Sequence, residues 1–107
     1  MDNGKLILVM IASSPQDANE MAQQLIDRRL VACVNIVDNV SSVFFWQGQR
    51  ATENESLLIC KTTEQAWPLL QKFINEYHPY EIPELVAWPL THASKEYETW
   101  VQKEVNA

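Results

Sequence analysis

Glycine is scarce in this chain of 107 residues, which carries only Gly4 and Gly48. Phosphate-binding loops of the Gly-rich kind need several closely spaced glycines, so no nucleotide motif of that type is present. The chain has two cysteines, but they form no CxxC pair, and no HExxH sequence occurs. The sequence therefore has no strong catalytic or metal-binding motif, and its function has to be inferred from weaker features in combination.

Positive charge is also limited, because eight Lys and Arg residues stand against fourteen Asp and Glu, for a formal net charge of −6. No run of basic residues occurs, so neither nucleic acid nor an anionic membrane is an expected partner. No apolar run approaches the roughly 20 residues that span a bilayer. The first residues also lack the basic region of a signal peptide apart from Lys5. We expect a single cytoplasmic domain over residues 1–107.

Apolar periodicity predicts the order strand, helix, strand, strand, helix, strand, helix. The first and third strands are apolar on both faces, as central strands are, whereas Pro89 confines the fourth strand to an edge. This pattern predicts the split βαβ plan of a ferredoxin-like α+β domain, with an extra C-terminal helix and a long hairpin between its second and third strands. The strands are expected over residues 5–12, 31–46, 55–63 and 85–90, and the helices near Ser14, residues 64–66 and Ser94.

The predicted second strand, residues 31–46, is unusually long. At about 3.3 Å per residue it would span ~50 Å, whereas a domain of this size has a radius of gyration near ~13 Å. The strand must bend or project, and Asp38 and Asn39 are the expected bend. Beyond it, Phe44 and Trp46 share one face of a two-stranded arm, which is unstable alone in water. We expect the arm to pack on a neighbouring copy; the alternative is an arm folded back over its own helices.

The polar residues 47–54 contain Gly48 and predict a hairpin loop. That loop would pair Trp46 with about Glu55, which leaves Cys33 and Cys60 roughly 25 Å apart along the strands. A disulfide needs Cα atoms within about 7 Å. Both thiols are therefore expected to be free and buried.

The densest polar group is HPYEIPE, residues 78–84, which two prolines keep out of helical geometry. One imidazole and nearby carboxylates can bind a divalent ion. We therefore predict His78 and Glu81 as metal ligands, and Tyr80 and Glu84 as residues that contact a ligand. The alternative is that the prolines only shape a connection and that the acids are solvated.

Two further side chains are candidates for ligand binding. Trp46 ends the long strand and can supply an aromatic contact. Lys61, flanked by Thr62 and Thr63, can hold an anion near the start of the next helix, although a plain ion pair is an equal alternative. His92 is expected to be a surface residue in a loop.

Several stretches form a recognisable combination: LVACVNIV at 30–37, Ser42 with Trp46 and Gly48, LLICKTT at 57–63, HPYEIPEL at 78–85, and Tyr97 with Trp100. Over roughly residues 6–102 they resemble the CutA family of divalent-cation tolerance proteins. The resemblance implies a ferredoxin-like subunit, a cytoplasmic homotrimer joined through the hairpin strands, and a link to copper and other divalent ions. It also implies a likeness to the trimeric nitrogen-regulatory signalling proteins, which bind small ligands between subunits. No organic cofactor is expected.

The chain departs from the family pattern at two places that bear on metal binding. Ala12 stands where some members carry a cysteine, and Tyr77-His78 stands where some carry two histidines. Because soft metals favour thiolate and imidazole, these departures weaken a copper site.

The main hypothesis is a non-enzymatic trimeric binding or signalling protein associated with divalent metal ion tolerance. The rival is an enzyme or small-ligand sensor with its site in the cleft between subunits, where His78 would act as general acid or base with Glu81. A trimer that only scaffolds another protein is a third possibility. In each functional case we expect the site where residues 78–84 meet the Trp46 arm of a neighbouring subunit.

Overall fold

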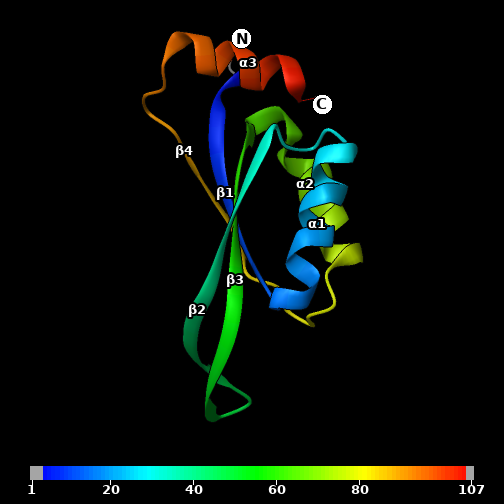
Figure 1. The fold of residues 1–107 in the computed structure, drawn as a ribbon, viewed down its shortest axis with the longest axis vertical. Helices are drawn as coiled ribbons and strands as arrows, with labels where there is room; N and C mark the ends of the chain where they lie inside the picture. The colour runs from blue at the N-terminus through cyan, green and yellow to red at the C-terminus, as the bar shows by residue number, and fades with distance from the viewer. Residues whose placement is uncertain (1–3, 106–107) are drawn as a thin grey trace.

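A four-stranded antiparallel sheet organises the fold, with its strands in the order β2-β3-β1-β4. The computed structural model describes residues 4–105 (Figure 1). The central strands are β1 and β3, and the edges are β2 and β4, which confirms the split βαβ plan predicted from the sequence. The strands are β1 Leu6–Ser13, β2 Cys33–Trp46, β3 Gln49–Thr63 and β4 Leu85–Pro89.

Three α-helices accompany the sheet: α1 Pro15–Asp27, α2 Trp67–Tyr77 and α3 Lys95–Glu104. A short 3-10 turn, Glu64–Ala66, leads into α2. Helices α1 and α2 cover one face of the sheet, and α3 lies at the end of the sheet opposite the hairpin tip (Figure 1). Pro15 begins α1, where a missing N–H costs nothing, and the Ser94 side chain accepts a hydrogen bond from the Tyr97 amide to cap α3. None of the helices within residues 4–105 is long and apolar enough to cross a membrane.

The core lies between the sheet and the two helices on its face. Val9 and Ile11 of β1 are fully buried, as are Met21 and Leu25 of α1 and Ile74 of α2. The apolar residues of α1 recur every three or four positions, which places them on the face turned toward the sheet. Each large aliphatic side chain buried in this way stabilises the fold by about 1.5–3 kcal/mol.

The long hairpin of β2 and β3 extends past the ends of α1 and α2 (Figure 1). Its outer part, residues 40–55, is called the arm below. A β-bulge separates Val37 from Val40, and Asn39 there has a left-handed φ of 62°. The Ser56 hydroxyl donates a 2.7 Å hydrogen bond to the Asp38 carboxylate, which holds the bulge. The bend predicted at Asp38 and Asn39 is confirmed, and the arm is not folded back over the helices.

The predicted hairpin loop over residues 47–54 is wrong. The turn contains only Gln47 and Gly48, because Trp46 pairs directly with Gln49. Both turn residues have positive φ, 53° and 80°, as in the tight type I′ turn that suits the twist of a hairpin. The polar residues beyond the turn belong to β3, since a projecting strand has no core that would require apolar side chains.

The corrected register also changes the account of the cysteines. Cys60 pairs with Val34 and Cys33 pairs with Lys61, so the two cysteines lie on adjacent strands and not far apart as predicted. Both are free, as expected, because successive residues of a strand point to opposite faces of the sheet. Cys60 is buried, whereas Cys33 is only partly buried.

Candidate functional site

His78 fixes the loop of residues 78–84 to the end of α2. Its backbone N–H donates to the Ile74 carbonyl over 2.9 Å, and its side chain is 7% exposed. Nε2 lies 2.8 Å from the Ala12 carbonyl oxygen, and Nδ1 lies 3.2 Å from the Tyr80 amide nitrogen. A carbonyl can only accept and an amide N–H can only donate, so this arrangement requires a neutral imidazole with its proton on Nε2.

Tyr80 connects this loop to the arm. Its hydroxyl donates a 2.8 Å hydrogen bond to Oε2 of Glu55, and its ring lies 4.6 Å from that of His78 between centroids. Burial raises the pKa of Tyr80, and the hydrogen bond to Glu55 raises it further. The phenol therefore stays protonated and serves as a donor.

Glu55 is unusual for an acidic residue, because it is only 5% exposed. Tyr80 is the partner of Oε2, whereas Oε1 keeps contact with solvent, since no buried side-chain oxygen in the described part of the chain lacks a hydrogen-bond partner. The ion pair found in that part of the chain joins Arg29 to Glu104 and does not involve Glu55. Glu55 is thus a largely buried residue whose carboxylate has one neutral donor, Tyr80, and keeps contact with solvent through its other oxygen.

Two cavities of about 330 and 400 Å³ open where the arm meets the loop. The first also includes Glu53 and Glu81 in its lining, and the second includes Glu84. Neither is lined by a Lys or Arg side chain. Five residues line both cavities and are called the arm–loop site below: Phe44, Trp46, Glu55, Tyr80 and Ile82.

Most of the residues predicted to form a site come together here. Trp46 and Tyr80 belong to the arm–loop site, and Glu81 and Glu84 each line one cavity. His78 lines neither cavity, but its Nδ1 accepts a hydrogen bond from the Tyr80 amide. The loop meets the arm of its own chain, and the contact expected with the arm of a neighbouring subunit stays a prediction.

Lys61 and His92 lie outside the arm–loop site. The Lys61 ammonium donates to the Asn35 side-chain oxygen, and Lys61 is paired with Cys33 across the strands. His92 is exposed and contacts Thr91, as expected for a surface loop.

The described residues of one chain form no ready-made metal site with three protein ligands. His78 uses both ring nitrogens on backbone groups, so neither offers a free lone pair. In the described part of the chain, no three His, Cys, Asp or Glu side chains lie close enough together to hold one ion. The carboxylates of Glu53 and Glu81 remain exposed beside the first cavity.

Glu55 is the site residue that the sequence reasoning missed. The available signal was the two-residue turn at Gly48, which pairs Phe44 with Ala51 and Val40 with Glu55. Because side chains alternate along a strand, that register puts Glu55 on the same face as Phe44 and Trp46.

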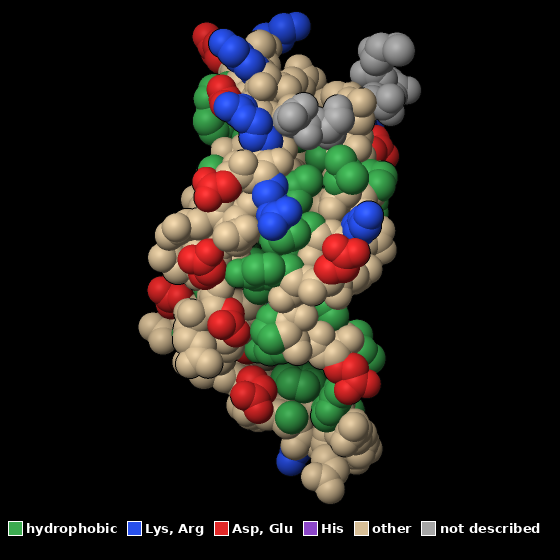
Figure 2. Space-filling view, turned by 90° about the vertical axis from the view of Figure 1, so that its right-hand side faces the viewer, with side chains coloured by type: hydrophobic (Ala, Val, Ile, Leu, Met, Phe, Trp, Pro, Cys, Tyr) green, Lys and Arg blue, Asp and Glu red, His purple; other side chains and the backbone are tan. Residues whose placement is uncertain are grey.

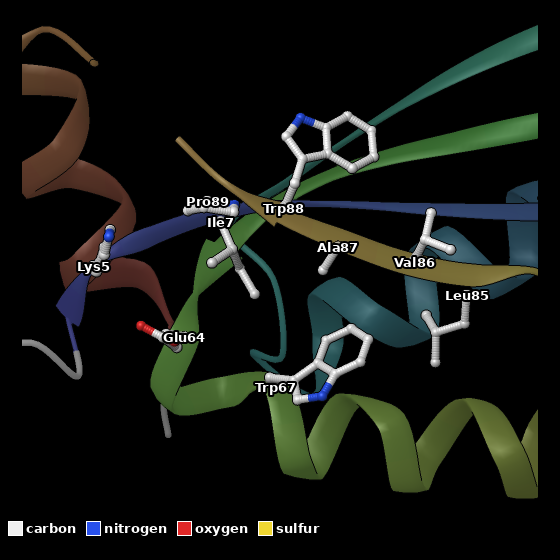
Figure 3. A pocket seen from close by; sticks show the side chains of 9 residues that line it. All are labelled: Lys5, Ile7, Glu64, Trp67, Leu85, Val86, Ala87, Trp88 and Pro89. Atoms are coloured by element: carbon white, nitrogen blue, oxygen red, sulfur yellow. The ribbon is translucent and has the colours of Figure 1, made fainter. Parts of the chain in front are cut away.

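A separate cavity of about 520 Å³ lies between β4 and the start of α2 (Figure 3). Trp67 and Leu85 face it from the helix side, while Val86 and Trp88 point to the opposite side of the sheet. The charged residues in its lining, Lys5 and Glu64, are exposed. None of the predicted site residues lines this cavity, and it lacks the buried charge that marks the arm–loop site.

The helix-bearing side of the molecule shows an uneven charge distribution (Figure 2). Basic side chains gather toward the end that carries α3, whereas acidic ones predominate toward the arm.

These features define a ferredoxin-like domain with a projecting hairpin whose arm meets the loop before β4. The family model described as "CutA1 divalent ion tolerance protein" matches residues 6–104. The divalent-cation tolerance protein CutA of Thermus thermophilus is 37% identical over 97 residues, which cover 91% of this chain and 94% of that protein. The chain belongs to the CutA1 divalent ion tolerance family, as the resemblance predicted.

Solved structures agree with this assignment. A Thermus thermophilus structure has a TM-score of 0.90 at 37% identity, covering 94% of this chain and 99% of that one. CutA1 from Oryza sativa has a TM-score of 0.93 at 30% identity, covering 99% and 98%. The human protein CutA is 34% identical over 86 residues, which cover 80% of this chain but 48% of that protein. The chain thus spans about half the length of some animal and plant relatives.

Proposed function

We propose that this divalent-cation tolerance protein acts as a non-enzymatic trimeric binding or signalling module, and that the arm–loop site is its ligand site. The observation that carries the proposal is the buried Glu55 carboxylate, which faces cavities walled by aromatic side chains. A carboxylate at the wall of such a cavity can orient a ligand through its charge and its hydrogen bonds. Cavities with apolar walls and a few polar groups are typical of small-ligand sites.

The rival enzymatic function has less support. Both ring nitrogens of His78 are engaged with backbone groups, so this residue is poorly placed to move a proton to or from a substrate. The free thiols, Cys33 and Cys60, lie in strand segments away from the residues that line the two cavities.

Assembly into a trimer is supported by the sheet face that α1 and α2 leave uncovered. Val86 and Trp88 of β4 are 43% and 44% exposed there, beside Met10 and Leu8 of the paired strand β1. The two edge strands differ, since β2 is long and β4 is short. If β2 of one copy meets β4 of the next, the contact is head-to-tail and can close into a ring.

A divalent ion at the arm–loop site would have to rely on carboxylates such as Glu53 and Glu81. Oxygen donors favour Mg²⁺ or Mn²⁺ and give little preference for Cu²⁺. Copper binding with His78 as a ligand would require the loop to release its backbone hydrogen bonds.

Light scattering and calorimetry test this proposal together. We expect three times the chain mass of 12.3 kDa at micromolar concentration, and weak Mn²⁺ binding that falls in Glu81→Gln. Trp88→Lys should reduce the mass of the assembly, while the control Leu69→Lys, on the exposed face of α2, should not. A monomeric parent protein, or Mn²⁺ binding unchanged in Glu81→Gln, would contradict the proposal.

A further inference from the structure

The cavity of about 520 Å³ between β4 and the start of α2, called the β4–α2 cavity below, has apolar walls along most of its length. Ile7 of β1, Trp67 of α2, and Leu85 and Ala87 of β4 form these walls. Trp67 and Leu85 are partly buried and pack against the core, so the walls belong to the fixed part of the fold. The volume is within the range of ~300–1,000 Å³ that is typical of small-ligand sites.

Two residues of opposite charge lie together at one end of this cavity (Figure 3). Lys5 stands two positions before Ile7, and alternation along the strand places both on the face that α2 covers. Glu64 follows Thr63, which pairs with Leu6 at the end of the β1–β3 ladder. The Glu64 amide also donates a 2.8 Å hydrogen bond to the Lys5 carbonyl. The end of the ladder thus brings one ammonium and one carboxylate to the same end of the cavity.

Neither of these charges has an ionic partner in the described part of the chain. The ion pair found within residues 4–105 joins Arg29 to Glu104. Lys5 and Glu64 are exposed, and they are the charged residues in the lining of the cavity. A ligand that matches this arrangement carries a negative group, a positive group close to it, and an apolar part that extends from both.

We propose that the β4–α2 cavity binds a free α-amino acid with a large apolar side chain. Its carboxylate would pair with the Lys5 ammonium, its ammonium would pair with the Glu64 carboxylate, and its side chain would lie against Trp67 and Leu85. Hydrogen bonds between charged groups are stronger than those between neutral ones, and the indole ring favours contact with an aromatic side chain. The cavity is separate from the arm–loop site, so this inference goes beyond the proposed function and does not rest on it.

Other ligands with apolar parts match the cavity less well. The N-terminus of a peptide has an ammonium group without a neighbouring carboxylate, and the C-terminus has a carboxylate without a neighbouring ammonium group. Each would leave Lys5 or Glu64 without a partner. A neutral apolar molecule would leave both without partners. The pair of charges therefore favours the free amino acid over a peptide end.

Titration of the full chain with L-phenylalanine, followed by ligand-observed NMR, tests the inference. L-phenylalaninamide lacks the carboxylate, and N-acetyl-L-phenylalanine lacks the ammonium group. Because exposed ion pairs contribute modestly, we expect each of these two compounds to bind about threefold to fivefold more weakly than L-phenylalanine. L-serine keeps both charges but has no apolar side chain, so it should bind more weakly as well.

Substitutions of the two charged residues should act selectively on these ligands. Lys5→Gln should weaken L-phenylalanine but leave L-phenylalaninamide unchanged, because the amide has no carboxylate for Lys5. Glu64→Gln should weaken L-phenylalanine but leave N-acetyl-L-phenylalanine unchanged. Lys103→Gln and Glu96→Gln, on the exposed surface of α3, are the matched controls and should bind as the parent does. Ala87→Trp, at an exposed position in the cavity wall, should abolish binding by filling the space.

Equal binding of the three phenylalanine compounds, or unchanged L-phenylalanine affinity in Lys5→Gln and Glu64→Gln, would overturn the inference. So would L-phenylalanine binding that Glu81→Gln abolishes and Ala87→Trp does not, because the ligand would then occupy the arm–loop site. If the parent binds no L-phenylalanine and Ala87→Trp lowers the mass of the assembly, a second copy covers the cavity and the inference is wrong. The proposed function concerns the arm–loop site and its Mn²⁺ binding, so a failure at the β4–α2 cavity leaves it standing.

Discussion

His78→Ala should destabilise the fold strongly, because the imidazole joins β1 to the loop of residues 78–84. The substitution leaves the Ala12 carbonyl and the Tyr80 amide without partners. Each lost hydrogen bond costs about 1 kcal/mol, and the buried ring leaves a cavity that adds to this. We expect a loss of about 2–4 kcal/mol in the free energy of unfolding, which lies in the upper part of the range for point substitutions.

Urea unfolding measures this loss, and it is done at one fixed protein concentration because the stability of the proposed trimer would depend on concentration. Glu81→Gln is the matched control, because Glu81 is exposed in the same loop and its change should stay within about 0.5 kcal/mol. The double variant His78→Ala with Tyr80→Phe should lose less than the sum of the two single losses, because both residues act on the same connection to Glu55. If His78→Ala loses no more free energy of unfolding than Glu81→Gln does, the imidazole does not hold the loop. His78 would then be free to act as a metal ligand, as the sequence predicted.

Three further predictions concern the cysteines and the hairpin turn. A thiol reagent should modify at most Cys33 in the native protein and both cysteines after denaturation, because burial raises the pKa of Cys60 to about 12. The Cys60 thiol has its ordinary pKa of 9.0 in the unfolded chain and a pKa of about 12 in the folded one, so the unfolded chain loses this proton at lower pH. The free energy of unfolding should therefore fall as pH rises from about 9 to about 12. Urea unfolding of Cys60→Ala should show a smaller fall over the same pH range. Gly48→Ala should cost about 1 kcal/mol, because the φ of +80° disfavours a side chain, while Gly48→Asn should cost less; equal losses in urea unfolding would count against the type I′ turn.

The arrangement of the sheet could be predicted because buried strand positions require apolar residues, and these form a clear pattern in the sequence. Strands β1 and β3 are the central strands, and their apolar runs are continuous because alternate residues are buried under the helices while those between them, such as Met10 and Ile59, are half-buried on the other face. Pro89 lies at the end of β4, on the edge of the sheet, where a missing N–H does not interrupt a ladder. Both features follow from local chemistry, and they sufficed to place the strands in order.

The hairpin was predicted less well, because its outer part projects from the core and does not need apolar residues. Strand β3 continues through polar residues 49–54, which the sequence pattern assigned to a loop. Polar composition indicates a loop only where a strand would have to face a core, and the arm projects beyond the core (Figure 1). The turn at Gly48 was the better guide to register than the apolar pattern.

The candidate site was located from its prolines and polar side chains, but the role of His78 was not. A sequence shows that an imidazole stands near two carboxylates, and metal ligation is a natural interpretation. Only the fold shows that the Ala12 carbonyl and the Tyr80 amide occupy both ring nitrogens. The partners are backbone groups, which no residue pattern can identify.

Glu55 shows why sequence patterns fail at the place where function is expected. Other buried polar side chains have their hydrogen bonds within the chain: Ser56 donates to Asp38, and Thr62 donates to the Leu30 carbonyl. Glu55 is the acidic residue that residues 4–105 bury, and its hydrogen bond within the chain comes from the Tyr80 hydroxyl. A pattern of apolar alternation treats such a residue as exposed, since a lone charge in a strand normally faces water. The fold buries Glu55 because Tyr80 of a distant loop donates a hydrogen bond to it, and such a contact between distant parts of the chain is not visible in a local sequence pattern.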